Sequence, residues 1–329
     1  MNKRLWLTWE TQRRNRTLSR ALGARLIELD YKLPRWRRYP RAIAATLRIL
    51  LADRPDLVFS QNPSLTLALF SVWYGRISGT PVVIDAHNAG ISPFEGRRGW
   101  ANRLARHVIR QARLTIVTTR ALANYVDQLG GRSFVLPDPL PELEPAAGTH
   151  ASAGPSVLFV CTWAPDEPYL EVLEAARRID PSIRVYVTGN SKGRERELRG
   201  ELPDNVVLTG FVPEQQFLDL LHTSDVIMDL TTRENCLVCG AYEAVAAGKP
   251  MVLSNTQALR QYFSKGAVYA DNTAESIAEA IEQAVAERGR LKDEVRLLEA
   301  ELSASWARRR DDLELTLRQR FARPLASRG

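Results

Sequence analysis

The sequence predicts an α/β protein built from two doubly wound parallel sheets. Short apolar runs alternate with segments of helical hydrophobic period along the whole chain, which is typical of parallel sheets covered by helices. The 329 residues exceed what one hydrophobic core organises well. A proline-rich stretch without a periodic apolar pattern, residues 137–156, separates the two halves. We therefore expect an N-terminal domain over residues 1–145, a linker over 146–156 and a C-terminal domain over 157–300.

Each half contains six candidate strands, and each strand is followed by a helix or a turn. The first half has apolar runs at residues 4–9, 25–29, 57–60, 82–85, 114–118 and 133–136. The second half has them at residues 157–161, 184–188, 206–209, 226–230, 251–254 and in a short run near Val268. After residue 272 the pattern is helical, with too few regular heptads for a coiled coil. Residues 301–329 are expected to form a last helix, anchored by Trp306.

Charge is distributed unevenly along the chain. Residues 1–145 hold 23 Lys and Arg against 11 Asp and Glu, whereas the other residues hold 22 against 27. The three cysteines, Cys161, Cys236 and Cys239, do not make a disulfide framework, and no leader segment precedes the first strand. The apolar run at residues 65–74 is shorter than the ~20 residues that a bilayer span needs. We therefore expect a cytoplasmic protein without membrane spans.

Residues 231–250 are the most informative segment of the chain. A loop of small and acidic residues leads into a short helix that ends at Gly248, between two apolar strands. Open α/β sheets bind ligands at such loops, and free N–H groups at a helix start suit a diphosphate. Gly240 lets the backbone approach closely, and the Glu243 carboxylate is able to accept hydrogen bonds from the vicinal hydroxyls of a ribose. The segment predicts a site for a nucleotide sugar.

Residues 243–250 resemble the donor-binding signature of GT-B glycosyltransferases, in particular the retaining family 4. The resemblance implies two Rossmann-like domains facing a cleft, with the last helix packing back toward the N-terminal domain. It also implies transfer of a hexose from a nucleoside diphosphate sugar to a lipid-linked or polysaccharide acceptor. The family has two glutamates separated by seven residues, whereas eight residues separate Glu234 from Glu243. Either Glu234 or Asn235 therefore takes the place of the first glutamate. Cys236 and Leu237 complete the expected donor loop.

The apolar run at 82–85 ends in polar residues, which places Asp85 and His87 at the carboxyl edge of the first sheet. Family 4 enzymes have a histidine at the end of this strand, close to the reacting sugar, and His87 matches it. In a retaining transfer the leaving phosphate takes the acceptor proton, and His87 positions hydroxyl groups. An inverting transfer needs a carboxylate as base, with Asp85 as the first candidate and Glu10 as the second. Both outcomes remain open.

The loop after the first strand contains Trp9, Glu10 and Arg13, which are the candidate acceptor-binding residues. An indole face suits a sugar ring, whereas the alternative is a Trp9 packed in the sheet edge with solvated arginines. No Gly-x-Gly-x-x-Gly pattern is present, which argues against a dinucleotide enzyme.

The loop after residue 161 lacks the Arg and Lys with which family members hold the donor diphosphate. Asp166 and Glu167 are expected to begin the next helix instead, where acidic residues suit the dipole. Lys192, after Asn190, would supply the missing positive charge together with Arg194, unless this is a basic surface loop. Trp163 would lie beneath the nucleotide base or pack in the core.

Residues 32–41 combine basic and aromatic side chains without the period of a helix or a strand, so we expect a loop. We expect this loop to contact anionic lipid headgroups rather than nucleic acid. A redox role for Cys236 and Cys239 is not favoured, because a thioredoxin-like context is absent. No Zn²⁺ or Mg²⁺ pattern occurs, so we expect no metal and no cofactor besides the donor. Competing hypotheses are a non-catalytic GT-B subunit in a glycan-assembly complex and, more weakly, a nucleotide-sugar epimerase.

Overall fold

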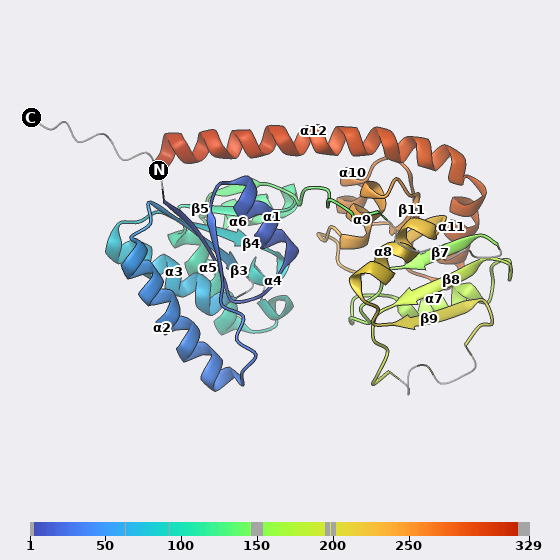
Figure 1. Ribbon diagram of the computed structural model, residues 1–329, viewed down its shortest axis with the longest axis horizontal. Helices are drawn as coiled ribbons and strands as arrows, with labels where there is room; N and C mark the ends of the chain where they lie inside the picture. Colours follow the sequence, from blue (N-terminus) through green and yellow to red (C-terminus); the bar gives the residue numbers. More distant parts are fainter. Residues whose placement is uncertain are drawn as a thin grey trace, which may run out of the picture. The chain divides into compact units, whose positions relative to one another are not determined.

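The computed structural model describes residues 3–62, 64–91, 93–145, 154–194, 198 and 202–321. The chain divides into two compact units, which are each described by themselves (Figure 1). Unit 1 comprises Met1–Asp138 and Ser305–Gly329, and unit 2 comprises Pro139–Ala304. The first unit thus ends before the expected linker. Leu140 and Leu143 pack against the core of unit 2, which explains their place in that unit. Residues 146–153 of the expected linker lie outside the described part.

Unit 1 contains a six-stranded parallel sheet, sheet A, with the order β2-β1-β3-β4-β5-β6. Its strands are β1 (Arg4–Thr8), β2 (Arg25–Glu28), β3 (Leu57–Asn62), β4 (Val82–Ala86), β5 (Leu114–Val117) and β6 (Ser133–Val135). Its helices are α1 (Arg13–Ala21), α2 (Arg35–Asp53), α3 (Leu65–Ser78), α4 (Asn88–Ile91), α5 (Gly99–Gln111) and α6 (Arg120–Gln128), with a 3-10 turn at Pro93–Gly96. The strand order reverses between β1 and β3.

Unit 2 contains a second six-stranded parallel sheet, sheet B, with the order β12-β11-β10-β7-β8-β9. Its strands are β7 (Ser156–Phe159), β8 (Arg184–Thr188), β9 (Val206–Gly210), β10 (Val226–Asp229), β11 (Met251–Ser254) and β12 (Ala267–Ala270). Its helices are α7 (Tyr169–Ala176), α8 (Glu214–Thr223), α9 (Cys239–Ala246), α10 (Gln257–Tyr262) and α11 (Ala274–Ala286). Here the order reverses between β7 and β10, as in dinucleotide-binding sheets.

Both faces of each sheet are buried, as parallel sheets require. In sheet A, Trp6, Phe59 and Val83 form one core cluster, which residues Leu313 and Leu317 of the last helix complete. Their strand neighbours Leu5, Leu7, Val58 and Val82 point to the other face and pack against α2, α3 and α5. Sheet B is likewise covered on both faces. This alternation fixes which strand-end side chains are exposed at the carboxyl edge.

The twelve predicted strands are all present, with ends that differ by at most two residues. One local prediction is wrong: residues 35–41 begin α2 rather than forming a loop. Pro40 lies within this helix, where it removes one backbone hydrogen bond, and it concealed the helical pattern. Buried Ala42, Thr46 and Leu50 recur at helical spacing and hold α2 on unit 1.

The last helix, α12 (Arg288–Phe321), is 34 residues long and begins before residue 301, where it was expected; residues 322–329 of the expected helix lie outside the described part. Its first turns contribute Leu291 and Val295 to the cores of unit 2, and its last turns belong to unit 1. There the Trp306 indole donates to the Pro137 carbonyl at 3.1 Å, and Glu314 pairs with Arg4. No helix in the described part is long and apolar enough to cross a membrane.

Candidate functional site

In unit 1 the candidate site lies at the carboxyl ends of β1, β3 and β4, where the strand order reverses. Such positions form ligand-binding crevices in doubly wound sheets. β3 ends with Gln61 and Asn62, β4 is followed by His87, and β1 is followed by Glu10. Gly90 allows α4 to approach Asn62, because a Cβ atom on Gly90 would lie 2.6 Å from the Asn62 side chain. The sequence thus brings several polar side chains to one edge.

Arg14 is the centre of this site, although its neighbour Arg13 was the predicted residue. The Arg14 guanidinium donates to both oxygens of Asp85 at 2.7 to 3.2 Å, and to Asp138 at 2.7 Å. It also donates to the Leu136 carbonyl at 3.1 Å. Both Arg14 and Asp85 are buried. Asp85 is therefore not accessible as a base toward an acceptor, which argues against that role.

His87 lies beside this ion pair without bonding to it. Its Nε2 atom is 3.9 Å from Asp85 Oδ2, which is too far for a hydrogen bond. Burial lowers the pKa of His87 below its ordinary value, against the opposing effect of Asp85, so the imidazole is neutral at neutral pH. Nε2 is buried and has no hydrogen-bond partner among the described residues. A buried nitrogen without a partner is the arrangement expected where a ligand hydroxyl completes the site.

Glu10 stands at the end of a chain of side-chain amides. The Thr8 hydroxyl is hydrogen-bonded to Gln61 Oε1. Gln61 Nε2 donates to Gln12 Oε1 at 2.6 Å, and Gln12 Nε2 donates to Glu10 Oε2 at 3.1 Å. Gln61 is fully buried and Glu10 is half-buried. The chain fixes the Glu10 carboxylate at the carboxyl edge of sheet A, where it was predicted.

Trp9 does not present its ring to a ligand, contrary to the prediction. It is 1% exposed, its indole donates to Thr46 Oγ1 at 3.1 Å, and its ring contacts Tyr39 edge-on. The alternative of a Trp9 packed in the sheet edge is the one observed. Arg13 is exposed at the start of α1.

In unit 2 the candidate site lies where β10 and β7 end side by side. β10 ends in Asp229, whose buried carboxylate accepts a hydrogen bond from the Gly240 N–H at 2.7 Å. Burial raises the pKa of Asp229 well above its ordinary value, and the Gly240 bond opposes this shift only in part. The N–H of Gly240 in the first turn of α9 is thus already occupied by Asp229. A Cβ atom on Gly240 would lie 2.7 Å from Asp229 Oδ2.

Asp166 and Glu167 were expected to begin the helix after this loop, but they form hydrogen bonds within the loops of this site instead. Asp166 accepts from the Thr231 hydroxyl at 2.9 Å and pairs with Arg233 at 3.2 Å, which connects the loop after β7 to the loop after β10. Glu167 accepts from the backbone N–H groups of Thr162 and Ala164, both at 2.9 Å. Because α7 begins only at Tyr169, the two carboxylates bind partners in the loops rather than the N–H groups of its first turn.

Trp163 packs in the core, which was the alternative to a place under a base. It is 4% exposed, its indole donates to the Thr188 carbonyl at 3.0 Å, and its backbone has a φ of +63°. Phe211, which follows β9 at the same carboxyl edge, is 86% exposed instead. The sequence contained a signal for this residue, since a large apolar side chain stands directly after a strand end.

The predicted donor residues fall into two groups. Glu234, Asn235, Asn190 and Lys192 are exposed in loops at the carboxyl edge of sheet B. Cys236, Leu237 and Glu243 are half-buried around the start of α9. Burial raises the pKa of Cys236 to about 11, so its thiol is protonated at neutral pH and is a poor nucleophile. The Arg194 guanidinium donates to the Trp163 carbonyl at 2.8 Å, so it supports the loop after β7.

Lys249, the lysine of the signature, lies away from this edge. Its Nζ donates to the carbonyls of His222 and Ser224 at 2.5 and 2.8 Å, and so binds the end of α8. Among the described residues, no three His, Cys, Asp or Glu side chains are grouped as a metal site.

Sequence reasoning missed Arg14, Gln61, Asn62 and Asp229. Polar residues at the ends of apolar runs gave a signal for Gln61, Asn62 and Asp229. Arg14 gave none, because only the packing of α1 on sheet A distinguishes it from Arg13 and Arg16.

Two family models match the chain. The model described as Glycosyl transferase 4-like domain matches residues 6–137, and that described as Glycosyl transferases group 1 matches residues 143–300. A comparison with curated proteins finds no significant match.

Solved structures with the same fold cover nearly the whole chain. Sucrose-phosphate synthase from Thermosynechococcus elongatus is 17% identical over 91% of this chain and 84% of that chain, with a TM-score of 0.71. Alr3699/HepE from Anabaena, in complex with UDP and glucose, is 16% identical over 96% and 91%, with a TM-score of 0.71. A putative UDP-N-acetylglucosamine 2-epimerase from Listeria monocytogenes is 12% identical over 93% and 86%, with a TM-score of 0.59. At these identities the likeness establishes the fold.

Proposed function

Because this chain belongs to the GT-B glycosyltransferases, as the family models over residues 6–137 and 143–300 show, we propose that it transfers a hexose from a nucleoside diphosphate sugar to a lipid-linked or polysaccharide acceptor. The predictions of this family and of two Rossmann-like sheets are confirmed. The proposal for the donor depends most on the loop from β10 to α9, which follows the strand-order reversal of sheet B and carries Glu243 one turn into the helix. A UDP-sugar is the first donor to test, since Alr3699/HepE has this fold and binds UDP-glucose.

In the proposed donor site, Glu243 accepts hydrogen bonds from the ribose hydroxyls, and the diphosphate lies near the start of α9. Lys192, exposed after β8 at the same sheet edge, supplies positive charge together with Asn190 as a donor. Glu234, Asn235, Cys236 and Leu237 form the loop around the sugar. The exposed ring of Phe211 replaces Trp163 as the partner of the base.

In the transfer, the acceptor hydroxyl oxygen bonds to the anomeric carbon while the bond from that carbon to the diphosphate oxygen breaks. The nucleoside diphosphate leaves with the electron pair, and in a retaining reaction its phosphate oxygen takes the acceptor proton. We assign to the neutral His87 the positioning of a hydroxyl group through its unpaired Nε2. Retention is supported because Asp85, the first candidate for an inverting base, is buried in its pair with Arg14.

Substitution of Glu10 distinguishes a retaining from an inverting transfer. If the transfer is retaining, Glu10→Gln keeps the Gln12 contact and lowers kcat by less than about tenfold. If Glu10 is an inverting base, the loss is on the order of 10² to 10⁴, the usual contribution of general base catalysis. The anomeric configuration of the product, read by NMR, decides independently.

The donor proposal is tested by titration with a panel of nucleoside diphosphate sugars. We expect micromolar binding of one of them, weakened at least tenfold by Glu243→Ala and several-fold by Lys192→Ala, with Lys292→Ala as an exposed control. Product analysis in the presence and absence of acceptor separates transfer from epimerisation, because an epimerase changes the sugar without any acceptor. Unchanged activity in the presence of EDTA is expected for the metal-independent reaction that we propose.

A non-catalytic subunit is the second candidate. It is favoured by the occupied N–H of Gly240 and by the carboxylates of Asp166 and Glu167 in the loop after β7, which oppose a diphosphate. Absence of binding to every nucleotide sugar, or binding indifferent to Glu243→Ala, supports this candidate and contradicts the transferase.

We also propose that the protein works at the inner face of the membrane. The exposed side of α2 combines Arg37, Arg41 and Arg48 with Trp36 and Leu51, and the only acidic residue of the helix is its last, Asp53. Basic helices with exposed tryptophan and leucine bind anionic bilayer surfaces.

A further inference from the structure

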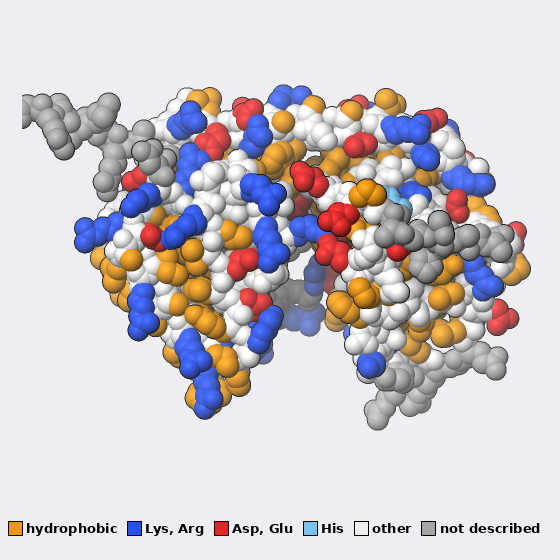
Figure 2. All heavy atoms as spheres, in the orientation of Figure 1, with side chains coloured by type: hydrophobic (Ala, Val, Ile, Leu, Met, Phe, Trp, Pro, Cys, Tyr) orange, Lys and Arg blue, Asp and Glu red, His pale blue; other side chains and the backbone are white. Residues whose placement is uncertain are grey.

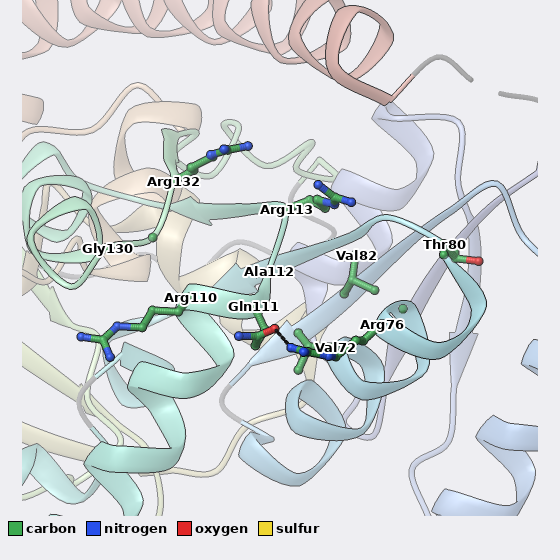
Figure 3. A pocket seen from close by; sticks show the side chains of 13 residues that line it. Val72, Arg76, Thr80, Val82, Arg110, Gln111, Ala112, Arg113, Gly130 and Arg132 are labelled. Atoms are coloured by element: carbon green, nitrogen blue, oxygen red, sulfur yellow. Dashed lines mark hydrogen bonds between the residues drawn. The ribbon is translucent and has the colours of Figure 1, made fainter. Parts of the chain in front are cut away.

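A pocket with a volume of about 430 Å³ opens at the edge of sheet A where the strands begin, opposite the edge of His87 (Figure 3). We call it the arginine pocket, because its charged lining residues are Arg76, Arg110, Arg113 and Arg132. Arg113 and Arg132 stand directly before the paired strands β5 and β6, and their side chains extend on the same side in Figure 3. No acidic residue of the described part of the chain lines this pocket.

None of these four arginines forms an ion pair with a carboxylate in the described part of the chain. Arg76 donates to the Gln111 side chain at 3.0 Å, and Arg110 donates to the Leu129 carbonyl at 2.8 Å. Both acceptors are neutral. The positive charge of the pocket is therefore not compensated by these contacts.

The positive charge of the four arginines exceeds the negative partial charge of the helix C-termini beside them. The helices α3, α5 and α6 end at this edge, and each helix C-terminus carries roughly half a negative charge, or about 1.5 charges together. Four guanidinium groups exceed this by more than two charges. The excess favours an anionic ligand, and guanidinium groups match phosphate oxygens in geometry.

Exposed apolar side chains beside the pocket indicate where the phosphate comes from. Trp73 and Ile77 flank Arg76 on α3 and are 62% and 70% exposed. The Tyr74 hydroxyl donates to the Leu50 carbonyl of α2 at 3.3 Å, which places the exposed Leu51 next to this part of α3. Figure 2 shows hydrophobic side chains gathered over α2 and α3, with Lys and Arg side chains between them. Binding of a soluble anion would not require these exposed apolar side chains, whereas a bilayer interface binds both apolar and basic side chains.

We propose that the arginine pocket binds the phosphate of an anionic phospholipid while Trp73 and Ile77 enter the bilayer interface. This rests on the membrane association proposed above and specifies its surface and its ligand chemistry. The pocket is at the opposite edge of sheet A from Glu10 and His87, so a phospholipid bound there leaves the candidate site of unit 1 unobstructed.

The test is co-sedimentation of the full chain with vesicles of phosphatidylcholine, with and without phosphatidylglycerol. Two variants are compared: Arg113→Glu with Arg132→Glu, and Trp73→Ala with Ile77→Ala. The control is Lys292→Glu with Arg308→Glu, which makes the same change of charge at exposed positions of α12 that have no ion pair among the described residues. Nucleotide-sugar binding of every variant is measured in solution as a check on folding and on the donor site.

We expect the wild type and the control to bind vesicles that contain phosphatidylglycerol. The Arg113 and Arg132 variant should bind at least 30-fold more weakly, since each basic residue near such a surface contributes about 1 kcal/mol. The Trp73 and Ile77 variant should also bind more weakly, and donor binding should be unchanged in both. Equal losses in the control, or no effect of either variant, overturn the proposal.

Inorganic phosphate and pyrophosphate, titrated by calorimetry, distinguish a lipid from a soluble anion. If Arg113→Glu with Arg132→Glu abolishes binding of these ions but leaves vesicle binding intact, the pocket is a soluble-phosphate site and the lipid proposal is wrong. Failure of the wild type to bind any vesicle also overturns it, whereas the transferase proposal is tested separately by the donor titration and the product analysis.

Discussion

Arg14 and Asp85 form a buried bidentate pair, with Nη2 2.7 Å from Oδ1 and Nε 3.0 Å from Oδ2. The same guanidinium holds Asp138, one residue before the start of unit 2. One side chain of α1 therefore connects the end of β4 to the last residue of this part of unit 1. The pair leaves His87 beside it without a competing bond, so the imidazole remains available to a ligand.

Removing Arg14 should destabilise unit 1 strongly. Arg14→Met leaves Asp85 buried without its cation, and such a loss costs about 3–5 kcal/mol. Arg16→Met, which breaks the exposed pair with Glu28, should cost less than about 1 kcal/mol. Urea unfolding, followed by fluorescence and circular dichroism, measures both. Similar losses in the two variants would show that the buried pair is not a main support of the site.

Gly240 should not tolerate a methyl group. In Gly240→Ala the new Cβ atom would lie 2.7 Å from Asp229 Oδ2 and 3.0 Å from Val160, so the start of α9 must shift. We expect a loss of about 1–3 kcal/mol in the free energy of unfolding, the usual cost of overpacking, together with weaker donor binding. Gly289→Ala is the matched control, because nothing lies within 4 Å of its Cβ position in α12. That variant should gain about 0.5–1 kcal/mol.

Asp229 should make stability fall as pH rises. Its pKa is raised in the folded state, so its contribution is fully present below the pKa of the unfolded chain and is lost as pH rises through the folded pKa. Asp229→Asn keeps an acceptor for Gly240 and removes the titration. The Tm of this variant relative to the wild type should therefore increase from pH 5 to pH 8. Asp311→Asn on α12 controls for the change of charge, and a difference that is constant with pH would refute the assignment.

The exposed end of α2 should make membrane binding dependent on salt. Trp36→Ala with Arg37→Glu and Arg38→Glu should weaken co-sedimentation with anionic vesicles, because the Arg37 guanidinium lies 4.4 Å from the Trp36 ring in an exposed cluster. Wild-type binding should decrease between 0.05 and about 0.5 M salt, as the Debye length shortens. Binding that is indifferent to salt would exclude an electrostatic contact.

The parallel-sheet architecture was predictable from the sequence because it depends on apolar runs that are local. Each strand of sheets A and B is a run of three to six residues that is mostly apolar, and such runs are visible one at a time. The helical start of α2 was not predictable, since Pro40 and five arginines obscured its period and only contacts with unit 1 stabilise it.

The site was predicted less completely, because it depends on the direction of side chains. The sequence placed Asp85 and His87 correctly at one edge, but the burial of Asp85 follows from Arg14, 71 residues earlier in the chain. Trp9 and Trp163 stand at strand ends, as expected for ligand contacts, yet each turns inward to a polar partner at Thr46 or Thr188. A buried indole needs such a partner for its N–H group, and the sequence does not show which partner is within reach.

The hydrogen bonds that connect the side chains of Thr8, Gln61, Gln12 and Glu10 all run in the same donor-to-acceptor direction. Each glutamine uses its amide nitrogen on the next member and its oxygen on the previous one, so no amide is able to flip alone without breaking two bonds. The row ends in a group that only accepts. An incoming molecule is therefore recognised there by the hydrogens that it offers, and a methyl ether in place of a sugar hydroxyl should be rejected at this position.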